Sequence, residues 1–330
     1  MSSGEAPSAA MLTVFSERRS DLLITAREMR AEGVVCLTLA DPHGTQLPAW
    51  TPGAHIDLLL DGIVRQYSLC GAPGDQNTWR IAILLAPDGR GGSRKVHQTL
   101  KAGSPIAVRG PRNHFPLHAA PRYIFIAGGI GITPILPMIA VATEAGSDWH
   151  LYYGGRSRAS MAFTDELESY GDRVTVWPQD EQGTLALDDI LASPAENVLV
   201  YCCGPEGLLA ATEQRCAAWP SGALHLERFS AKPQVEPAEG EEVTFEVVCQ
   251  RSGVTVTVPP DASIVDALEA QDVSVLSSCL EGVCGTCVTT VLEGIPDHRD
   301  FVLTEDERET GKDIMVCVSR SKSDRLVLDL

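Results

Sequence analysis

The cysteines near the C-terminus constrain this chain more than any other feature. They follow the pattern Cys-x4-Cys-x2-Cys, then 29 residues, then a fourth cysteine: Cys279, Cys284, Cys287 and Cys317. Three thiolates within nine residues need a tight loop. Gly282 and Gly285 permit that loop because glycine adopts positive φ freely. The spacing is typical of a [2Fe–2S] cluster, which implies a one-electron centre.

A zinc site and a disulfide framework are the alternative interpretations of these cysteines. Zinc accepts four cysteines, but structural zinc sites usually bring two close pairs, whereas here three ligands share one loop and the fourth stands alone. A disulfide framework is disfavoured because the other cysteines show no regular spacing: Cys36, Cys70, Cys202, Cys203, Cys216 and Cys249. Unpaired cysteines of this kind suit a reducing cytoplasm.

Length and charge limit the fold class and the partners. A chain of 330 residues predicts two or three domains, each with its own core. The net charge of −18 argues against nucleic acid and anionic membranes, which both require basic patches. Residues 243–330 carry half of this charge, with 7 Lys and Arg against 16 Asp and Glu. We expect this segment to dock on a basic face of a partner protein.

Neither a secretory signal nor a membrane span is predicted. Residues 1–11 are small and polar, without the apolar run of a signal peptide, and are interpreted as a disordered tail. Residues 123–143 lack charge and are long enough to span a bilayer, but several Gly and Pro residues lie in their middle. A buried strand, turn and helix is the preferred interpretation.

Residues 12–112 predict a small antiparallel barrel. Short β patterns separated by turn residues are expected at 22–26, 34–39, 56–60, 67–69, 79–85 and 106–108. The barrel contains Arg65-Gln66-Tyr67-Ser68 and later Gly89-Arg90-Gly91-Gly92-Ser93. An arginine fork suits a phosphate, a tyrosine ring suits a flat ligand, and a Gly-Gly-Ser turn exposes amides and a hydroxyl to an anion. Alone, the Arg-x-Tyr-Ser tetrapeptide more often belongs to an ordinary strand than to a ligand site.

Residues 113–230 alternate between strands and helices, which predicts a parallel sheet flanked by helices. Strand 123–127 leads into Gly128-Gly129-Ile130-Gly131-Ile132-Thr133-Pro134 and a helix at 135–145. Thr133 as N-cap and Pro134 as first helical residue form a start signal. The glycines would admit a diphosphate to the helix N-terminus, although proline replaces the last glycine of the usual fingerprint. Further strands are expected at 151–153, 174–177 and 198–202, with helices around 163–170, 187–191 and 206–217.

Two further groups in this segment are candidate site residues. Cys203-Gly204-Pro205 follows a strand at the carboxyl end, where ligands of open α/β sheets bind, although a buried core cysteine is the other interpretation. Cys202 should point the opposite way. Arg156 and Arg158 stand where an acidic residue would select the ribose 2′-hydroxyl of NADH. They are suited to the 2′-phosphate of NADPH, to a diphosphate or to solvent.

Residues 231–242 combine proline, glycine and charge and are interpreted as a linker. Residues 243–330 then predict a small mixed sheet with a helix and the cysteine loop. Strand patterns occur at 243–249 and 254–258. Ser263 with Asp266, and Thr304 with Glu307, have the spacing of helix capping boxes.

Taken in order, these motifs resemble the phthalate dioxygenase reductase family, the reductases of Rieske-type oxygenases, over about residues 13–330. The resemblance implies an FMN-binding barrel, a nicotinamide-dinucleotide domain and a β-grasp ferredoxin domain in one cytoplasmic, monomeric oxidoreductase. It implies that hydride passes from NADH or NADPH to the flavin, and that single electrons pass through the cluster to the oxygenase. A stand-alone flavin diaphorase and a non-catalytic electron-transfer module are the rival interpretations.

The resemblance also implies residue roles. Arg65 and Ser93, with amides near Gly91 and Gly92, would hold the flavin phosphate. Tyr67 would pack on the flavin ring, Ser68 would lie near its N5 atom, and Phe229 of Glu227-Arg228-Phe229 would cover the other face. Thr133 would lie between flavin and dinucleotide, and Cys203 near the nicotinamide. The remaining implied cofactor contacts are Gln66, Ala82, Gly128, Gly129, Gly131, Pro134, Arg156, Arg158, Gly204 and Pro205. NADH is favoured over NADPH by the resemblance, whereas the two arginines favour tolerance of NADPH.

Overall fold

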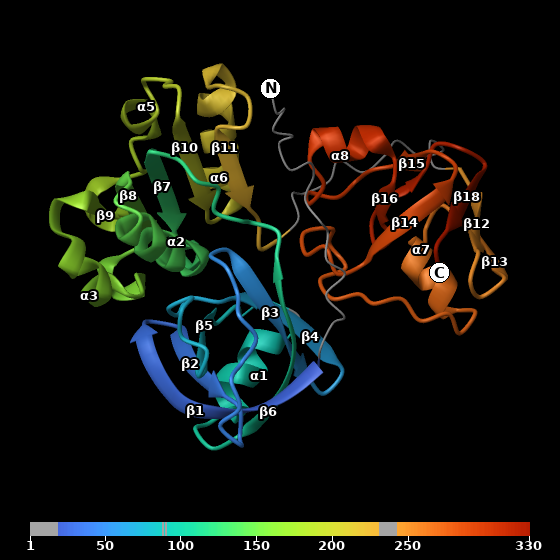
Figure 1. The fold of residues 1–330 in the computed structure, drawn as a ribbon, viewed down its shortest axis with the longest axis horizontal. Coiled ribbons are helices and arrows are strands. Elements are labelled where there is room, and N and C mark those ends of the chain that lie inside the picture. Colours follow the sequence, from blue (N-terminus) through green and yellow to red (C-terminus); the bar gives the residue numbers. More distant parts are fainter. Residues whose placement is uncertain (1–18, 88, 90, 231–242) are drawn as a thin grey trace, which may run out of the picture.

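The computed structural model describes residues 19–87, 89, 91–230 and 243–330. The predicted tail and the predicted linker lie outside these residues. Each of three consecutive stretches of the described chain builds its own main β-sheet. Figure 1 shows the first sheet at the bottom, the second at the upper left and the third at the right. This multidomain arrangement is the predicted fold class.

The first stretch is an antiparallel barrel. Its strands are β1 (Arg19–Ala31), β2 (Val34–Ala40), β3 (Ala54–Leu60), β4 (Ile63–Ser68), β5 (Thr78–Leu84) and β6 (Pro105–Asn113). They pair in the order β4-β3-β6-β1-β2-β5, and a bridge between Leu69 and Ile81 joins the two ends of this row. The inward residues form an apolar core around the fully buried Trp79. All six strand patterns found in the sequence fall on these strands.

One element of the barrel was missed in the sequence. The Gly-Gly-Ser segment is not a simple turn, because helix α1 (Gly92–Thr99) begins within it. Gly91 precedes the helix with φ +86°, a conformation that favours glycine, and the chain enters the first turn directly afterwards. The amides expected in a turn are therefore those of a helix N-terminus.

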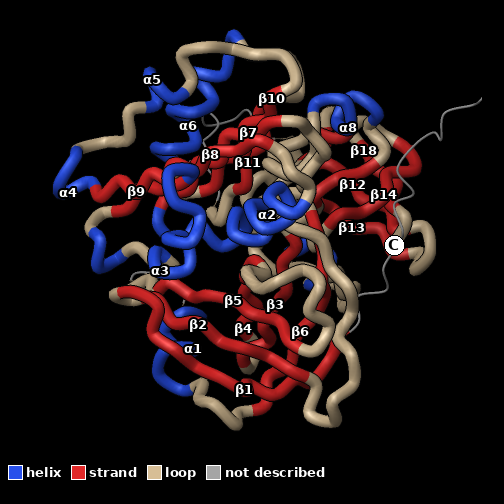
Figure 2. The backbone as a smooth tube through the Cα atoms, turned by 60° about the vertical axis from the view of Figure 1, so that its left-hand side comes forward, coloured by secondary structure: helices blue, strands red, loops and turns tan. Residues whose placement is uncertain are grey.

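The second stretch is a five-stranded parallel sheet in the order β11-β10-β7-β8-β9. The strands are β7 (Arg122–Gly128), β8 (Asp148–Gly155), β9 (Val174–Pro178), β10 (Val198–Cys203) and β11 (Leu224–Glu227). The flanking helices are α2 (Ile132–Glu144), α3 (Thr164–Leu167), α4 (Gln179–Gln182), α5 (Leu187–Ile190) and α6 (Glu206–Arg215), and they cover the sheet in Figure 2. Strand β11 and helix α4 had no clear sequence signal.

The predicted start of α2 is wrong in detail. The helix begins at Ile132 after a 3-10 turn at Gly129–Gly131, so Thr133 lies inside its first turn and is not the N-cap. The Thr133 hydroxyl donates to the carbonyl of Ile130 at 3.0 Å instead of accepting from an amide of the helix. Pro134 remains compatible because the first helical turn needs no amide donor there.

The third stretch is the predicted small mixed sheet, in the order β13-β12-β18-β14-β16. Its strands are β12 (Phe245–Cys249), β13 (Val254–Val258), β14 (Val288–Glu293), β16 (Asp313–Met315) and β18 (Arg325–Leu328), with β15 (Pro296–Asp297) pairing with β17 (Arg320–Ser321). Helices α7 (Ile264–Glu269) and α8 (Glu305–Thr310) both begin with the predicted capping boxes. We call residues 277–287, between α7 and β14, the cluster loop.

Besides cores of their own, the barrel and the parallel sheet share one apolar cluster, which the third stretch does not enter. Val34, Cys36 and Cys70 of the barrel pack in the same apolar cluster as Phe125 and Tyr153 of the parallel sheet. The Glu166 carboxylate on α3 is held by Arg30 at 2.9 Å and by Arg80 at 2.8 Å. The apolar core of the third stretch contains residues of that stretch alone. Within the described ranges, no helix is long and apolar enough to cross a membrane.

Candidate functional site

A cavity of about 590 Å³ lies where the three stretches meet. Its walls include Arg65–Ser68 of the barrel, Glu227–Phe229 at the end of the parallel sheet, and Ser278 and Cys279 of the cluster loop. This volume is within the range of cofactor sites, roughly 300–1,000 Å³. The cavity therefore connects the predicted flavin, dinucleotide and cluster regions.

One end of the cavity is suited to a phosphate. Arg65 on β4 lies directly over the N-terminus of α1, where a Cβ on Gly92 would stand 2.5 Å from the arginine Cγ. A guanidinium and the free amides of a helix N-terminus both favour an anion. Ser93, in the first turn of α1, also lines the cavity, and its Oγ accepts from the Ala86 amide at 3.0 Å. Gly91 precedes the helix and does not line the cavity.

The middle of the cavity offers flat and small side chains. Tyr67, Ser68 and Ala82 line it from the barrel, and Phe229 lines it from the end of the parallel sheet with 45% of its surface exposed. Burial raises the pKa of Tyr67 to about 12, so its ring is neutral at pH 7. A phosphate end followed by aromatic walls fits FMN, for which Arg65 and the α1 amides would hold the phosphate.

The glycines after β7 serve packing as well as ligand access. A Cβ on Gly131 would overlap the backbone of Cys203, and one on Gly128 would lie 2.7 Å from Pro205. The loops after β7 and β10 therefore touch backbone to backbone, at the point where the strand order reverses. Gly129, with φ +55°, faces open space. Thr133 lines the cavity, whereas Gly128, Gly129, Gly131, Pro134, Gly204 and Pro205 do not.

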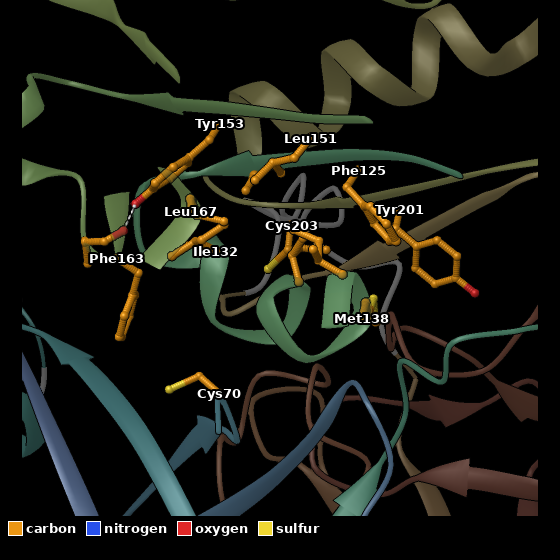
Figure 3. Close-up of a cluster of buried hydrophobic side chains, with 14 of the residues drawn as sticks. Cys70, Phe125, Ile132, Met138, Leu151, Tyr153, Phe163, Leu167, Tyr201 and Cys203 are labelled. Carbon is orange, nitrogen blue, oxygen red and sulfur yellow. Dashed lines mark hydrogen bonds between the residues drawn. The ribbon is translucent and has the colours of Figure 1, made fainter. Parts of the chain in front are cut away.

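Cys203 ends β10 as predicted, but the structure buries it completely. Figure 3 shows its side chain among Phe125, Ile132 and Tyr201, while Cys202 packs in the core on the other face of the sheet. The Cys203 thiol donates to Glu227 at 3.9 Å. Burial raises the pKa of Glu227 to about 8 and that of Cys203 well above its usual value, which favours the protonated form of each. Glu227 lines the cavity. In the sequence it appeared only as the first residue of the Glu227-Arg228-Phe229 motif, and no role was predicted for it.

The cluster loop brings the four predicted cysteines together. The thiols form a chain of hydrogen bonds in which Cys279 contacts Cys284 and Cys317, and Cys317 contacts Cys287. In the described parts of the chain, no three His, Cys, Asp or Glu side chains surround a single point in the way one metal ion requires. A [2Fe–2S] cluster takes two thiolates per iron, four in all, and Cys279, Cys284, Cys287 and Cys317 supply that number.

Three polar residues between the barrel and the cluster loop were not singled out in the sequence: His55, Asp57 and His114. Asp57 is completely buried, and His55 is 5% exposed. Burial and Arg112 hold the pKa of His55 well below its usual value, so its ring is neutral at pH 7, whereas His114 is exposed. A charged residue in the apolar strand Ala-His-Ile-Asp-Leu-Leu-Leu was the available signal for Asp57.

Arg156 and Arg158 lie outside the cavity, on the exposed surface after β8. Arg158 forms a salt bridge with Glu181 at 2.9 Å, which occupies its guanidinium. Of the two arginines, Arg156 is therefore better placed to meet a ligand that approaches the carboxyl end of the sheet.

Comparisons with known proteins agree with this geometry. Residues 125–214 match an oxidoreductase NAD-binding domain, and residues 247–322 match a 2Fe-2S iron-sulfur cluster binding domain. The phenoxybenzoate dioxygenase subunit beta of Ectopseudomonas oleovorans is 43% identical over 312 residues, covering 94% of this chain and 97% of that protein. The structure of phthalate dioxygenase reductase, titled as a modular structure for electron transfer from pyridine nucleotides to [2Fe-2S], matches with a TM-score of 0.70, 36% identity and coverage of 94% of this chain and 98% of that one.

This chain belongs to the phthalate dioxygenase reductase family. An intact type IV self-sufficient cytochrome P450 monooxygenase also matches, with a TM-score of 0.89 and 44% identity over 94% of this chain. The chain spans only 41% of that longer protein. The reductase-family architecture thus occurs both as a separate chain and as part of a larger one.

Replacing Arg65 tests the phosphate end of this family's cavity. We expect Arg65→Ala to weaken FMN binding by about 10–100-fold, since a hydrogen bond to a charged group contributes roughly 1.5–3 kcal/mol. Titration of the apoprotein with FMN, followed by fluorescence, measures the dissociation constant. Arg94→Ala is the matched control, because Arg94 is an exposed residue of α1 that does not line the cavity. Equal FMN affinity in Arg65→Ala and wild type would contradict the assignment.

Proposed function

We propose that this protein is the reductase component of a Rieske-type oxygenase system, taking electrons from NADH and delivering them singly through a [2Fe–2S] cluster. The observation that carries the proposal is the cavity shared by the phosphate-binding end of the barrel, the carboxyl end of the parallel sheet and the cluster loop. A reductase needs these three regions in contact, whereas a ferredoxin with an attached regulatory domain does not.

The chemistry requires a converter between two-electron and one-electron transfer. Each NADH oxidised to NAD⁺ releases two electrons and a proton, whereas a [2Fe–2S] cluster accepts one electron at a time. FMN, when bound, accepts hydride and releases electrons singly. The protein residues would bind and orient the cofactor: Arg65 and Ser93 would hold the phosphate, and Tyr67 and Phe229 would enclose the ring. Ser68 and Thr133 lie where hydride would cross, and Cys203 and Glu227 support that wall.

One anaerobic experiment tests this function. Addition of NADH to the purified protein should bleach a flavin band and then the absorption of a cluster with about two irons and two sulfides per chain. Zinc without sulfide, or a flavin band that NADH leaves unchanged, would refute the reductase assignment. Rapid turnover of one small acceptor without a partner protein would instead favour a stand-alone diaphorase.

The nicotinamide preference is testable at the two arginines after β8. If Arg156 reads a 2′-phosphate, Arg156→Ala should raise the KM for NADPH by about tenfold or more, the loss of one charged hydrogen bond, and leave the KM for NADH nearly unchanged. Arg158→Ala is the matched control and should have a smaller effect, because Glu181 already holds Arg158. Steady-state kinetics with both nucleotides measure this. Equal changes in the KM for NADH and for NADPH would mean that Arg156 binds anions in general and does not read the 2′-phosphate.

The proposed partner is the terminal oxygenase, which would meet the acidic C-terminal stretch with a basic face. We further propose that the protein is a cytoplasmic monomer. None of the ten cysteines, all of which lie in the described ranges, forms a disulfide, and this supports a reducing compartment.

A further inference from the structure

Three adjacent barrel strands, β4, β3 and β6, hold the cluster loop through polar contacts. The Ser278 hydroxyl donates to Asp57 of β3 at 3.4 Å. Arg109 of β6 donates to the Ser277 carbonyl at 3.5 Å. Gln66 of β4, expected to contact the cofactor, donates to the Thr286 hydroxyl at 3.4 Å. These contacts hold the cluster loop before Cys279 and after Cys284.

A ring of the barrel also packs directly on the loop. His114 follows β6, and a Cβ on Gly285 would lie 2.5 Å from its Nε2 and 2.7 Å from its Cε1. Gly285 itself has φ +69°, so glycine is required there for both space and backbone conformation. Behind His114 lies the ring of His55, with centroids 5.7 Å apart. Both rings line the cavity together with Ser278 and Cys279.

The carboxylate at the centre of this face is firmly held in place. Asp57 receives Arg112 at 2.7 Å and Arg109 at 2.9 Å, and none of its side chain is exposed. Removing one partner of such a buried pair is strongly destabilising because it leaves a buried charge uncompensated, so the three side chains depend on one another. An apolar residue would suit the surrounding strand better if Asp57 served only the barrel core. The Asp57 carboxylate therefore serves contacts outside the barrel core.

We propose that His55, Asp57, Gln66, Arg109, Arg112 and His114 form a built docking surface that holds the cluster loop beside the flavin cavity. His114 is a positioning residue for electron transfer from flavin to cluster. This inference rests on the proposed function and adds the residues that set the distance between the two redox centres. The preformed surface means that this transfer occurs with the third stretch docked.

The test compares His114→Ala with the ring-preserving His114→Phe and with His150→Ala. His150 is the matched control, because it is a partly buried histidine on β8, away from the cavity. Rapid mixing with NADH gives two rate constants, one for flavin bleaching and one for cluster bleaching. We expect their ratio, cluster to flavin, to fall severalfold in His114→Ala, because a loosened cluster loop lengthens the distance over which the electron is transferred. His114→Phe and His150→Ala should keep the ratio within about twofold, because neither removes a ring from the loop contact.

A second readout does not depend on turnover. Hydrogen exchange of the amides at 277–286 should speed up in His114→Ala and remain slow in the other two variants. Arg109→Lys provides an independent variant in case His114→Ala fails to fold, because a lysine keeps the charge but cannot reach both Asp57 and Ser277. It should show the same faster exchange and a ratio lowered by about threefold, as one hydrogen bond is lost.

Unchanged loop exchange and an unchanged ratio in both His114→Ala and Arg109→Lys would overturn the proposal, as would equal losses in His114→Ala and His114→Phe. Failure of the proposed function looks different. In that case NADH would not bleach the cluster of the wild-type protein at all, whatever the variants do.

Discussion

Replacing Cys284 with serine is expected to abolish electron transfer to one-electron protein acceptors. Cys284 is 2% exposed and lies in contact with Cys279. A serine in its place would remove one of the four cluster ligands, and because the position is buried no other ligand would replace it. We expect cytochrome c reduction by NADH to fall by more than 100-fold, since losing only a partner of a metal ligand typically costs about 10–100-fold. Reduction of ferricyanide, which can take electrons from the flavin, should persist.

Cys249→Ser is the matched control for this variant. Cys249 is a completely buried cysteine of β12 in the same core, and no sequence or structural observation makes it a ligand. A hydroxyl in that position should cost about 1–3 kcal/mol of folding free energy but leave the cluster spectrum intact. If Cys284→Ser kept the cluster absorption and the iron content of the control, the ligand assignment would be wrong.

Ending the chain after Lys232 is expected to leave a folded, flavin-containing fragment without one-electron output. The barrel and the parallel sheet share a core that no residue beyond 242 enters, whereas all four cluster cysteines lie beyond the cut. The fragment should bind FMN and reduce ferricyanide with NADH at a rate within about threefold of the intact chain. Its support of oxygenase turnover should fall to background, as measured by NADH-driven product formation with the purified oxygenase.

The two activities separate the possible outcomes. Oxygenase turnover at the intact chain's rate would mean that electrons leave directly from the flavin, and the proposed order of transfer would be wrong. Loss of flavin together with dye reduction would mean that the cluster domain stabilises the flavin site, contrary to the separate cores described above. Full-length protein purified in parallel controls for both activities.

The sequence predicted those parts of the fold that are determined by residues close together in the chain. The cysteine spacing, the capping boxes at Ser263 and Thr304 and the alternation of strands and helices all depend on residues close together in the chain. Thr133 was misassigned as an N-cap because a 3-10 turn at Gly129–Gly131 precedes the helix and places its start at Ile132, so the Thr133 hydroxyl donates to the Ile130 carbonyl. Sequence alone does not reveal that 3-10 turn.

The residues between the domains could not be found in this way. Asp57 and Ser278 are 221 positions apart, and His114 meets Gly285 only after the barrel and the cluster loop are placed together. Their roles depend on the arrangement of folded units and not on local sequence. Cys203 shows the same limit, since its position at a strand end was predictable but its complete burial depends on α2 and the barrel.

The shared core of the barrel and the parallel sheet has a consequence for gene fusion. A recombination event between these two would cut through the apolar cluster that they share and expose its side chains on both halves. A break after them severs mainly polar contacts, so the third stretch can be gained, lost or exchanged as a cassette. Oxygenase systems can thus exchange the domain that carries the cluster while the barrel and the parallel sheet are inherited together.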